Sequence, residues 1–317
     1  MLGVFLDFET MAAADLDLGA FESALPEWRL HEATAADEVR ARIQGATVVV
    51  VNKVVLDAAC LQNAPDLRLV CIAATGTNNV DLAAARAAGV TVCNVRGYST
   101  ASVSQHTFAL ILALATRLID YDAAVRAGRW QRSRQFCFLD YPITELAGRT
   151  LGIVGYGELG RAVARLGEAF GMRILLAERP GGPAQPGRLP LEELLPQVDV
   201  LSLHCPLTEH TRGLIGREAL ARMPSHAVLI NTARGGIVDE SALAAALREG
   251  RIGGAGVDVL STEPPREGNP LLEEDIPNLI VTPHSAWGSH AARQRVIDEV
   301  VRLIERFLAG RPDNIVA

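Results

Sequence analysis

The fold is decided by the stretch Thr150-Leu-Gly-Ile-Val-Gly-Tyr-Gly-Glu-Leu-Gly-Arg161. Its apolar residues predict a short strand that stops at Gly155, and the residues from Arg161 to Phe170 predict a helix. A second apolar run, Arg173-Ile-Leu-Leu-Ala-Glu178, then ends on an acid. The order strand, glycine turn, helix, strand, acid is typical of a dinucleotide-binding βαβ unit.

The glycines of this turn have separate physical roles. Gly155 allows the tight turn, Gly157 lets a pyrophosphate approach the backbone because it has no Cβ, and Gly160 lets the helix pack closely on the sheet. The helix N-terminus offers free N–H groups and a positive dipole end to phosphates, and Glu158 and Leu159 of the turn are also expected to contact the cofactor. An ordinary βαβ turn with incidental glycines is the alternative interpretation.

The choice of coenzyme depends on the acid that ends the second strand. Glu178 follows Gly160 by 18 residues, which is close to where a carboxylate would accept hydrogen bonds from the adenosine ribose. A carboxylate there accepts from a 2′-hydroxyl and repels a 2′-phosphate, so the sequence predicts NAD as cofactor. Arg179 is the next residue, and a guanidinium that swings over the ribose would also allow NADP.

Length and composition limit the class of protein. The chain has 317 residues, which favours two domains, and its net charge of −7 argues against a nucleic-acid partner. Its longest strongly apolar stretch, Phe108 to Ala115, is too short to span a bilayer, so no membrane association is expected. Asp7 and Glu9 stand where a secretory signal needs basic residues, and a cytoplasmic location is predicted. No metal site is expected, because five widely spaced cysteines form no ligand pattern.

Strand-like and helix-like segments alternate along the whole chain. This predicts an α/β fold of two doubly wound parallel sheets with a cleft between them. We expect a flavodoxin-like substrate-binding (catalytic) domain from residues 1–98 plus 286–317, and a Rossmann dinucleotide-binding domain from residues 99–285. A long helix is predicted from Ala101 to about Leu118, and the segment from Gly288 to Leu308 is expected to pack back onto the first domain. The predicted strands of the first domain are Leu2–Phe8, Thr47–Asn52, Leu67–Ala73 and Thr91–Val95.

A first candidate for chemistry lies in Leu229-Ile-Asn-Thr-Ala-Arg234-Gly-Gly-Ile-Val-Asp239. The apolar strand ends at Asn231 and delivers Arg234 into a loop. Ligands bind outside the carboxyl ends of strands in a doubly wound sheet, so Arg234 is placed to hold a substrate carboxylate with two hydrogen bonds. A surface arginine in a turn is the alternative.

Two further candidates follow later strands. Gly256-Val-Asp258-Val-Leu-Ser-Thr-Glu263-Pro-Pro265 and Ile280-Val-Thr-Pro-His284 each place a titratable residue after an apolar run. A glutamate beside a histidine would orient the ring and raise its pKa, as a proton donor near neutral pH requires. Taken alone, either residue has a structural alternative.

Together these motifs resemble the D-isomer-specific 2-hydroxyacid dehydrogenases over essentially the whole chain. Within that family the segments Ala74-Thr-Gly-Thr-Asn-Asn-Val-Asp81 and Thr282-Pro-His-Ser-Ala-Trp287 look most like glycerate dehydrogenases (hydroxypyruvate reductases). The resemblance implies that Arg234, Glu263 and His284 form the catalytic triad. It also implies that the backbone amides of Thr75 and Gly76 hold the substrate carboxylate.

The resemblance assigns the remaining site residues. Lys53, after a first-domain strand, could contact substrate or be a solvated loop lysine. The residues after the third strand of the nucleotide domain are expected against the adenine, and Asp258 is expected near the nicotinamide amide or ribose. The other expected cofactor contacts are Cys205, Pro206, Thr211, Thr232, Ala233, Asp258 and Ala286.

The expected function is NAD(H)-dependent interconversion of a small 2-keto acid and its D-2-hydroxy acid, with hydroxypyruvate or glyoxylate as the keto acid. The resemblance also suggests a homodimer formed through the nucleotide domain. The alternatives are another D-2-hydroxyacid dehydrogenase, a phosphite dehydrogenase, or a non-catalytic NAD(H)-sensing regulator on the same fold. Formate dehydrogenases of the superfamily carry Gln where this chain has Glu263, which argues against them. His106 and His204 lie in apolar segments and are interpreted as core histidines.

Overall fold

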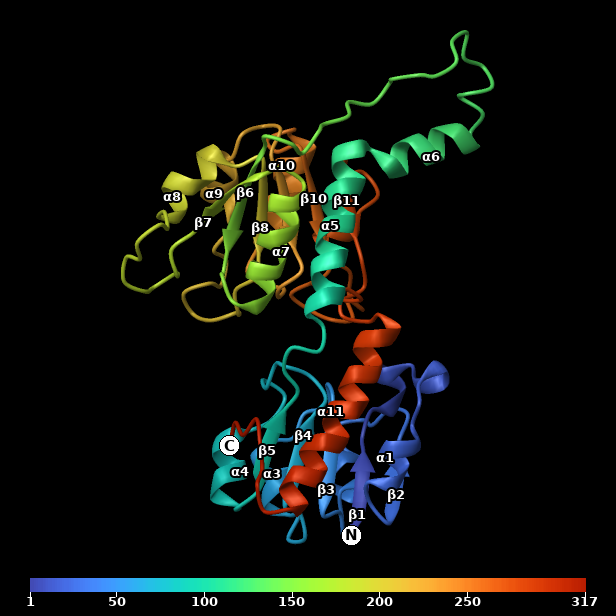
Figure 1. The fold of residues 1–317 in the computed structure, drawn as a ribbon, viewed down its shortest axis with the longest axis vertical. Coiled ribbons are helices and arrows are strands. Elements are labelled where there is room, and N and C mark those ends of the chain that lie inside the picture. Colours follow the sequence, from blue (N-terminus) through green and yellow to red (C-terminus); the bar gives the residue numbers. More distant parts are fainter. The chain divides into compact units, whose positions relative to one another are not determined.

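The computed structural model describes residues 1–317 and divides into two compact units (Figure 1). Unit 1 contains Met1–Ser99 and Gly288–Ala317, and unit 2 contains Thr100–Trp287. Each unit is built on its own parallel sheet, which has five strands in unit 1 and six in unit 2. The chain is therefore an α/β protein with two separate parallel sheets, as the alternation of segments predicts.

The sheet of unit 1 has the strand order β2-β1-β3-β4-β5. Strands β1, β3 and β4 are buried along their whole length, which explains their continuous apolar sequence. The C-terminal tail pairs with β5, where Val316 donates from its backbone N–H to the carbonyl of Val92 at 2.8 Å. The strands are β1 Leu2–Phe5, β2 Glu27–Leu30, β3 Val48–Val51, β4 Leu69–Ile72 and β5 Thr91–Asn94.

Four of the five helices of unit 1 are short, with four to six residues each. The Asp57 side chain accepts a hydrogen bond from the Cys60 N–H at 2.7 Å and so caps the helix that starts at Ala58. The long C-terminal helix packs on β4 and on the first helix of the same unit. The helices are α1 Gly19–Ser23, α2 Val39–Arg42, α3 Ala58–Gln62, α4 Leu82–Ala87 and α11 His290–Leu308, and short 3-10 turns cover Phe8–Met11 and Ala13–Asp15.

Strand β2 is absent from the sequence-based prediction. Its residues are mostly exposed, so no apolar run marks the strand. It forms because Trp28 stacks on Phe21 with ring centroids 4.2 Å apart, which anchors this edge of the sheet.

The sheet of unit 2 has the order β11-β10-β9-β8-β6-β7. Beyond β7, Leu189 forms a single parallel bridge with Ala177, at the position of a third strand reduced to one residue pair. Counting that bridge, the order becomes the 3-2-1-4-5-6 Rossmann pattern with one more strand at the far edge. The strands are β6 Thr150–Val154, β7 Arg173–Leu176, β8 Val200–Leu203, β9 Val228–Asn231, β10 Gly254–Val257 and β11 Leu279–Val281.

Helix α5, Thr100–Thr116, is the long helix that the sequence predicts, and within unit 2 it packs on α7, β9 and β10. Helix α7 begins at Glu158, directly after Gly157, which is three residues earlier than predicted. The other helices are α7 Glu158–Ala169, α8 Leu191–Leu194, α9 Arg217–Arg222 and α10 Glu240–Arg248, with 3-10 turns at Leu195–Gln197 and Pro270–Leu272.

Helix α6, Leu118–Arg126, contains no buried residue. The segment 127–145 leaves it as an extended arm, drawn in green, that leads back to β6 (Figure 1). Large apolar side chains of this region are exposed, including Phe136 at 88% and Leu139 at 76%. No helix of the structure is long and apolar enough to cross a membrane.

Candidate active site

The candidate residues of unit 2 lie on loops that follow the carboxyl ends of parallel strands. Because the strands run in one direction, these loops share one edge of the sheet. The glycine turn follows β6, Glu178 follows β7, Cys205 follows β8, Arg234 follows β9 and Asp258 follows β10.

The glycine turn is built by close approaches that exclude other residues. Gly155 has a φ of +94°, and a Cβ at this position would lie 2.6 Å from the backbone of His204. A Cβ on Gly160 would lie 2.1 Å from the carbonyl oxygen of Gly155. Both glycines are therefore required by the packing of the protein on itself.

Gly157 differs from its neighbours, because a Cβ there would meet no atom within 4 Å. It is the N-cap of α7, a helix of 12 residues, and no side chain caps that helix end. The unused N–H groups and the open space fit the phosphates of a dinucleotide. The nearest acid on the helix, Glu158, is engaged by a hydrogen bond of 2.6 Å from the Thr100 hydroxyl.

The residues expected around the adenosine follow the next two strands. Glu178 is partly buried and its N–H donates to the Leu189 carbonyl at 2.8 Å, whereas Arg179 is exposed. After β8, the Thr211 hydroxyl donates to the carbonyl of Pro206 at 2.7 Å and so closes that loop. Burial raises the pKa of the Cys205 thiol to about 11, so the sulfur is a neutral packing group there.

The loop after β9 is ordered by its own asparagine. Asn231 donates from Nδ2 to the carbonyl of Arg234 at 3.0 Å and accepts from the N–H of Ala233 at 3.1 Å. The Thr232 hydroxyl is buried and lies 3.0 Å from that of Thr107 on α5. The guanidinium of Arg234 stays exposed, where its Nη1 donates to the Ala233 carbonyl at 2.7 Å.

Glu263 and His284 form a direct pair. Nδ1 of His284 lies 2.6 Å from Oε2 of Glu263, and the other oxygen of Glu263 accepts from the Leu260 N–H at 2.8 Å. Since the carboxylate accepts the Nδ1 proton, Nε2 of His284 is left for a ligand. Both side chains are about one-third exposed, at 27% for His284 and 35% for Glu263, so a ligand can reach them.

Asp258 organises the loop that carries His284. Its carboxylate is almost fully buried and accepts from the N–H of Ser285 at 2.9 Å, the N–H of Ala286 at 3.0 Å and the Thr282 hydroxyl at 2.6 Å. Its carbonyl also accepts from the N–H of His284 at 2.8 Å. These bonds hold His284 at a φ of +51°, a left-handed conformation that a non-glycine residue keeps only when its surroundings enforce it.

Sequence reasoning missed two residues that position this site. Glu240, the first residue of α10, accepts from the N–H and the hydroxyl of Ser261 at 2.6 and 2.7 Å and so fixes the loop of Glu263. His106 on α5 lies 3.0 Å from the Thr282 hydroxyl through its Nε2. Neither contact joins neighbouring residues in sequence, so no local motif could have indicated it.

The candidate substrate residues of unit 1 lie on loops after β3 and β4. The N–H of Lys53 donates to the buried carboxylate of Asp7 at 2.6 Å. The Thr75 hydroxyl donates to the Val95 carbonyl at 2.9 Å. Asn79 joins the two loops by donating to the Val54 carbonyl at 3.0 Å, so the three sequence-predicted residues Lys53, Thr75 and Gly76 belong to one connected loop cluster.

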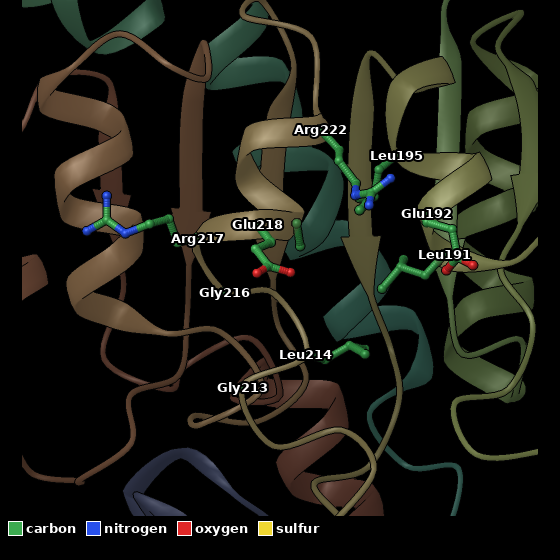
Figure 2. Close-up of a pocket in the computed structure, with 10 residues that line it drawn as sticks. Leu191, Glu192, Leu195, Gly213, Leu214, Gly216, Arg217, Glu218 and Arg222 are labelled. Carbon is green, nitrogen blue, oxygen red and sulfur yellow. The ribbon is translucent and has the colours of Figure 1, made fainter.

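A pocket of about 540 Å³ opens elsewhere on unit 2, between α8 and the start of α9 (Figure 2). In the close-up the guanidinium of Arg222 is drawn between the side chains of Glu218 and Glu192, and Arg217 points away from them (Figure 2). None of the candidate site residues lines this pocket. It is therefore separate from the loops that carry the chemistry.

Comparison with known proteins gives a consistent picture. Residues 108–286 match the family model of the D-isomer specific 2-hydroxyacid dehydrogenase NAD binding domain. The chain is 48% identical to a glycerate dehydrogenase of Methylorubrum extorquens, over 99% of this chain and 98% of that one. It is 37% identical to a hydroxypyruvate reductase of Blautia hydrogenotrophica, over 99% of this chain and 98% of the relative.

A solved structure has the same fold over the full chain. The NADPH-dependent glyoxylate/hydroxypyruvate reductase of Sinorhizobium meliloti, in complex with NADP and malonate, superposes with a TM-score of 0.83 at 29% identity, covering 100% of this chain and 96% of that one. The Glu263–His284 pair fits the family that these matches indicate. The sequence matches show that the chain belongs to the D-isomer specific 2-hydroxyacid dehydrogenase family, as an NAD(P)-dependent oxidoreductase acting on CH–OH groups.

Proposed function

We propose that the preferred reaction is the reduction of hydroxypyruvate to D-glycerate, with glyoxylate to glycolate as a second reaction, and with NADH as reductant. The single observation that carries this proposal is the Glu263–His284 pair, with Nδ1 and Oε2 only 2.6 Å apart. The 48% identity to a glycerate dehydrogenase over nearly the whole chain supports the choice of substrate.

In this proposal three side chains of unit 2 divide the work. Arg234 holds the substrate carboxylate and orients the keto group, since a guanidinium matches a carboxylate with two hydrogen bonds. His284 donates the proton on Nε2 to the keto oxygen as that oxygen gains negative charge. Glu263 keeps the ring oriented and stabilises its protonated form. Reduced nicotinamide, when bound, supplies the hydride to the keto carbon.

We further propose that unit 1 is the substrate-binding domain, with boundaries close to residues 1–98 and 286–317. The amides of Thr75 and Gly76 would hold the carboxylate, and Lys53 would add a positive charge. Asn79 joins these loops, which supports their acting together. The cofactor would contact Gly155 to Gly160, Glu178, Thr232, Ala233, Asp258 and Ala286, with Cys205, Pro206 and Thr211 beside the adenine.

The test is loss of NADH absorbance with purified protein and hydroxypyruvate, glyoxylate, pyruvate or 2-ketoisocaproate. We expect hydroxypyruvate to be turned over fastest, and His284→Ala to lower kcat by about a thousandfold. Arg234→Lys keeps the charge but loses the fork geometry, and its main effect is expected on KM. A protein that binds NADH tightly and reduces none of these acids would contradict the proposal and favour an NAD(H)-sensing regulator.

Coenzyme choice has its own test. We expect Glu178→Gln to weaken NADH binding and to raise the efficiency with NADPH, because it removes the carboxylate that repels a 2′-phosphate. The exposed Glu168→Gln on α7 is a matched control that should alter neither. If the wild type and Glu178→Gln show the same ratio of efficiencies with NADH and NADPH, Glu178 does not select NAD.

We also propose a cytoplasmic homodimer. The exposed apolar side chains of α6 and the arm, Ile119, Trp130, Phe136 and Leu139 among them, find no core in their own unit, which is the usual mark of an interface. Sedimentation analysis should give twice the chain mass. Phe136→Asp combined with Leu139→Asp should shift the protein toward monomer, and a wild type that sediments as a monomer would contradict this part.

A further inference from the structure

His106 lies on α5, in a helix whose other face is packed into the core, and its side chain is 23% exposed. Its Nε2 is 3.0 Å from Thr282 Oγ1 and 3.6 Å from Oδ1 of the buried Asp258. The contact spans 176 residues of sequence and reaches the loop of His284.

The proton positions in this chain of contacts follow from valence. Thr282 has one hydroxyl proton, and it donates that proton to Oδ1 of Asp258 at 2.6 Å. The hydroxyl can then only accept from His106, so Nε2 of His106 must carry a proton. This holds whether the ring is neutral or charged, because a charged imidazole has protons on both nitrogens.

The hydrogen bonds that begin at His106 end at the loop of residues 282–286. Thr282 donates from its N–H to the Val257 carbonyl at 2.9 Å, and Asp258 accepts from the N–H groups of Ser285 and Ala286. Between these points His284 adopts its left-handed conformation, which the bonds on either side must enforce. Without His106 the Thr282 side chain loses its second partner and can rotate away from Asp258.

Helix α5 supplies two more bonds to the same region. Ser102 donates to the carbonyl of Ala286 at 2.6 Å, and Thr107 pairs with Thr232 beside Arg234. Ser102 and His106 lie four residues apart and therefore share one face of the helix, and Thr107 follows His106 on the adjacent, buried face. One rigid element therefore contacts two of the three loops that carry the candidate catalytic residues, those of Arg234 and His284.

We propose that His106 is a positioning residue for the reaction: its Nε2–H holds Thr282, Thr282 holds Asp258, and Asp258 fixes the loop that presents His284. The proposal rests on the proposed role of His284 as proton donor. His106 itself touches neither substrate nor nicotinamide in this scheme. A displaced proton donor slows chemistry more than it weakens coenzyme binding.

The test compares two substitutions at one position. His106→Leu removes the donor, and we expect kcat for hydroxypyruvate to fall about tenfold while the Kd for NADH changes less than kcat. His106→Gln keeps an N–H near the place of Nε2 and should recover kcat to within about threefold of the wild type. Gln105→Ala, at an exposed neighbour on the same helix, is the control and should retain wild-type kcat.

A double-mutant cycle separates positioning from general packing. Thr282→Val breaks the same chain of contacts, so His106→Leu combined with Thr282→Val should be no slower than Thr282→Val alone. Wild-type kcat in His106→Leu would overturn the proposal. So would a His106→Gln variant as slow as His106→Leu with an equally lowered Tm, because that pattern indicates packing only.

A second measurement does not depend on turnover. Nitrogen-15 spectra of the histidine rings should show a proton on Nε2 of His106 in the wild type, and the His284 signals should shift in both His106→Leu and Thr282→Val. An unprotonated Nε2, or His284 signals that do not move, would overturn the proposal even if the wild type reduced no keto acid. Absent turnover with the expected spectra would instead contradict the proposed function alone.

Discussion

The two sheets place the same topological feature at their centre and fill it differently. In each, the strand order reverses beside the first strand, between β1 and β3 in unit 1 and between β6 and β8 in unit 2. Such a reversal leaves a crevice at the carboxyl ends, where backbone N–H groups point outward. In unit 1 the crevice holds Asp7, whose carboxylate accepts from the N–H groups of Asn52, Lys53 and Val54 at 2.9, 2.6 and 3.0 Å.

In unit 2 the acid at the equivalent crevice, Glu158, accepts from the Thr100 hydroxyl at 2.6 Å. Gly157 faces open space there, and His204, at the end of β8, is kept neutral because burial lowers its pKa to about 4. The comparison teaches that one topology makes an anion site twice. Unit 1 satisfies it with its own carboxylate, and unit 2 leaves open space at Gly157, which supports the proposed phosphate site there.

The largest expected effect is on the turn of unit 2. Gly160→Ala places a Cβ 2.1 Å from the Gly155 carbonyl oxygen, so the helix must move off the sheet. We expect the free energy of unfolding to fall by about 4 kcal/mol, measured with urea. Gly216→Ala is the control, since its Cβ would meet its nearest atom at 3.5 Å. Equal stability of the two variants would contradict the close approach.

The next largest effect is expected in unit 1. Asp7→Ala leaves three N–H groups without their acceptor, and we expect a loss of about 3 kcal/mol in the free energy of unfolding. Asp7→Asn retains one acceptor oxygen and should lose less. Asp66→Ala, at an exposed position, is the control. If Asp7→Ala unfolds at the same urea concentration as Asp66→Ala, the Asp7 carboxylate does not stabilise unit 1 by accepting these hydrogen bonds.

A pH-dependent effect is expected from His204. Its folded-state pKa of about 4 lies below the ordinary value of 6.5, so only the unfolded chain binds a proton there between these limits. Stability from this group is therefore complete above about pH 6.5 and is lost as the pH falls toward about 4. Between pH 6.5 and pH 4 the His204→Gln variant should lose about 3 kcal/mol less of its unfolding free energy than the wild type does, measured by urea unfolding at each pH. Parallel curves for the two proteins would contradict a neutral buried imidazole.

The substitution with the smallest expected effect on stability, Gly157→Ala, tests coenzyme binding most directly. Gly157→Ala meets no protein atom within 4 Å, so we expect stability within about 0.5 kcal/mol of wild type. The added methyl would instead meet the pyrophosphate, and the Kd for NADH should rise about tenfold by titration calorimetry. Unchanged NADH affinity would show that the open space at Gly157 is not the phosphate site.

Much of the fold follows from local sequence. Strands β3, β4 and β6 are continuous apolar runs because they are buried on both faces, and Gly155 and Gly160 mark the turn because no side chain fits there. Strand β2 could not be predicted, because its exposed residues carry no pattern and the Trp28–Phe21 stack that anchors it is a tertiary contact. The single bridge of Leu189 with Ala177 is invisible in sequence for the same reason.

The sequence by itself determined the order of the candidate site groups along the chain. They are the glycine turn, Glu178, Arg234, Glu263 and His284, and each follows a predicted strand. Short motifs reveal only side chains that are close in sequence, because the periodicity of a strand or a helix is a local property of the chain. Only the tertiary structure decided that Glu263 and His284 lie 2.6 Å apart across 21 residues, and that His106 reaches Thr282 across 176. Those distances depend on how parallel strands and α5 pack together, and packing is a property of the whole sheet and not of any segment.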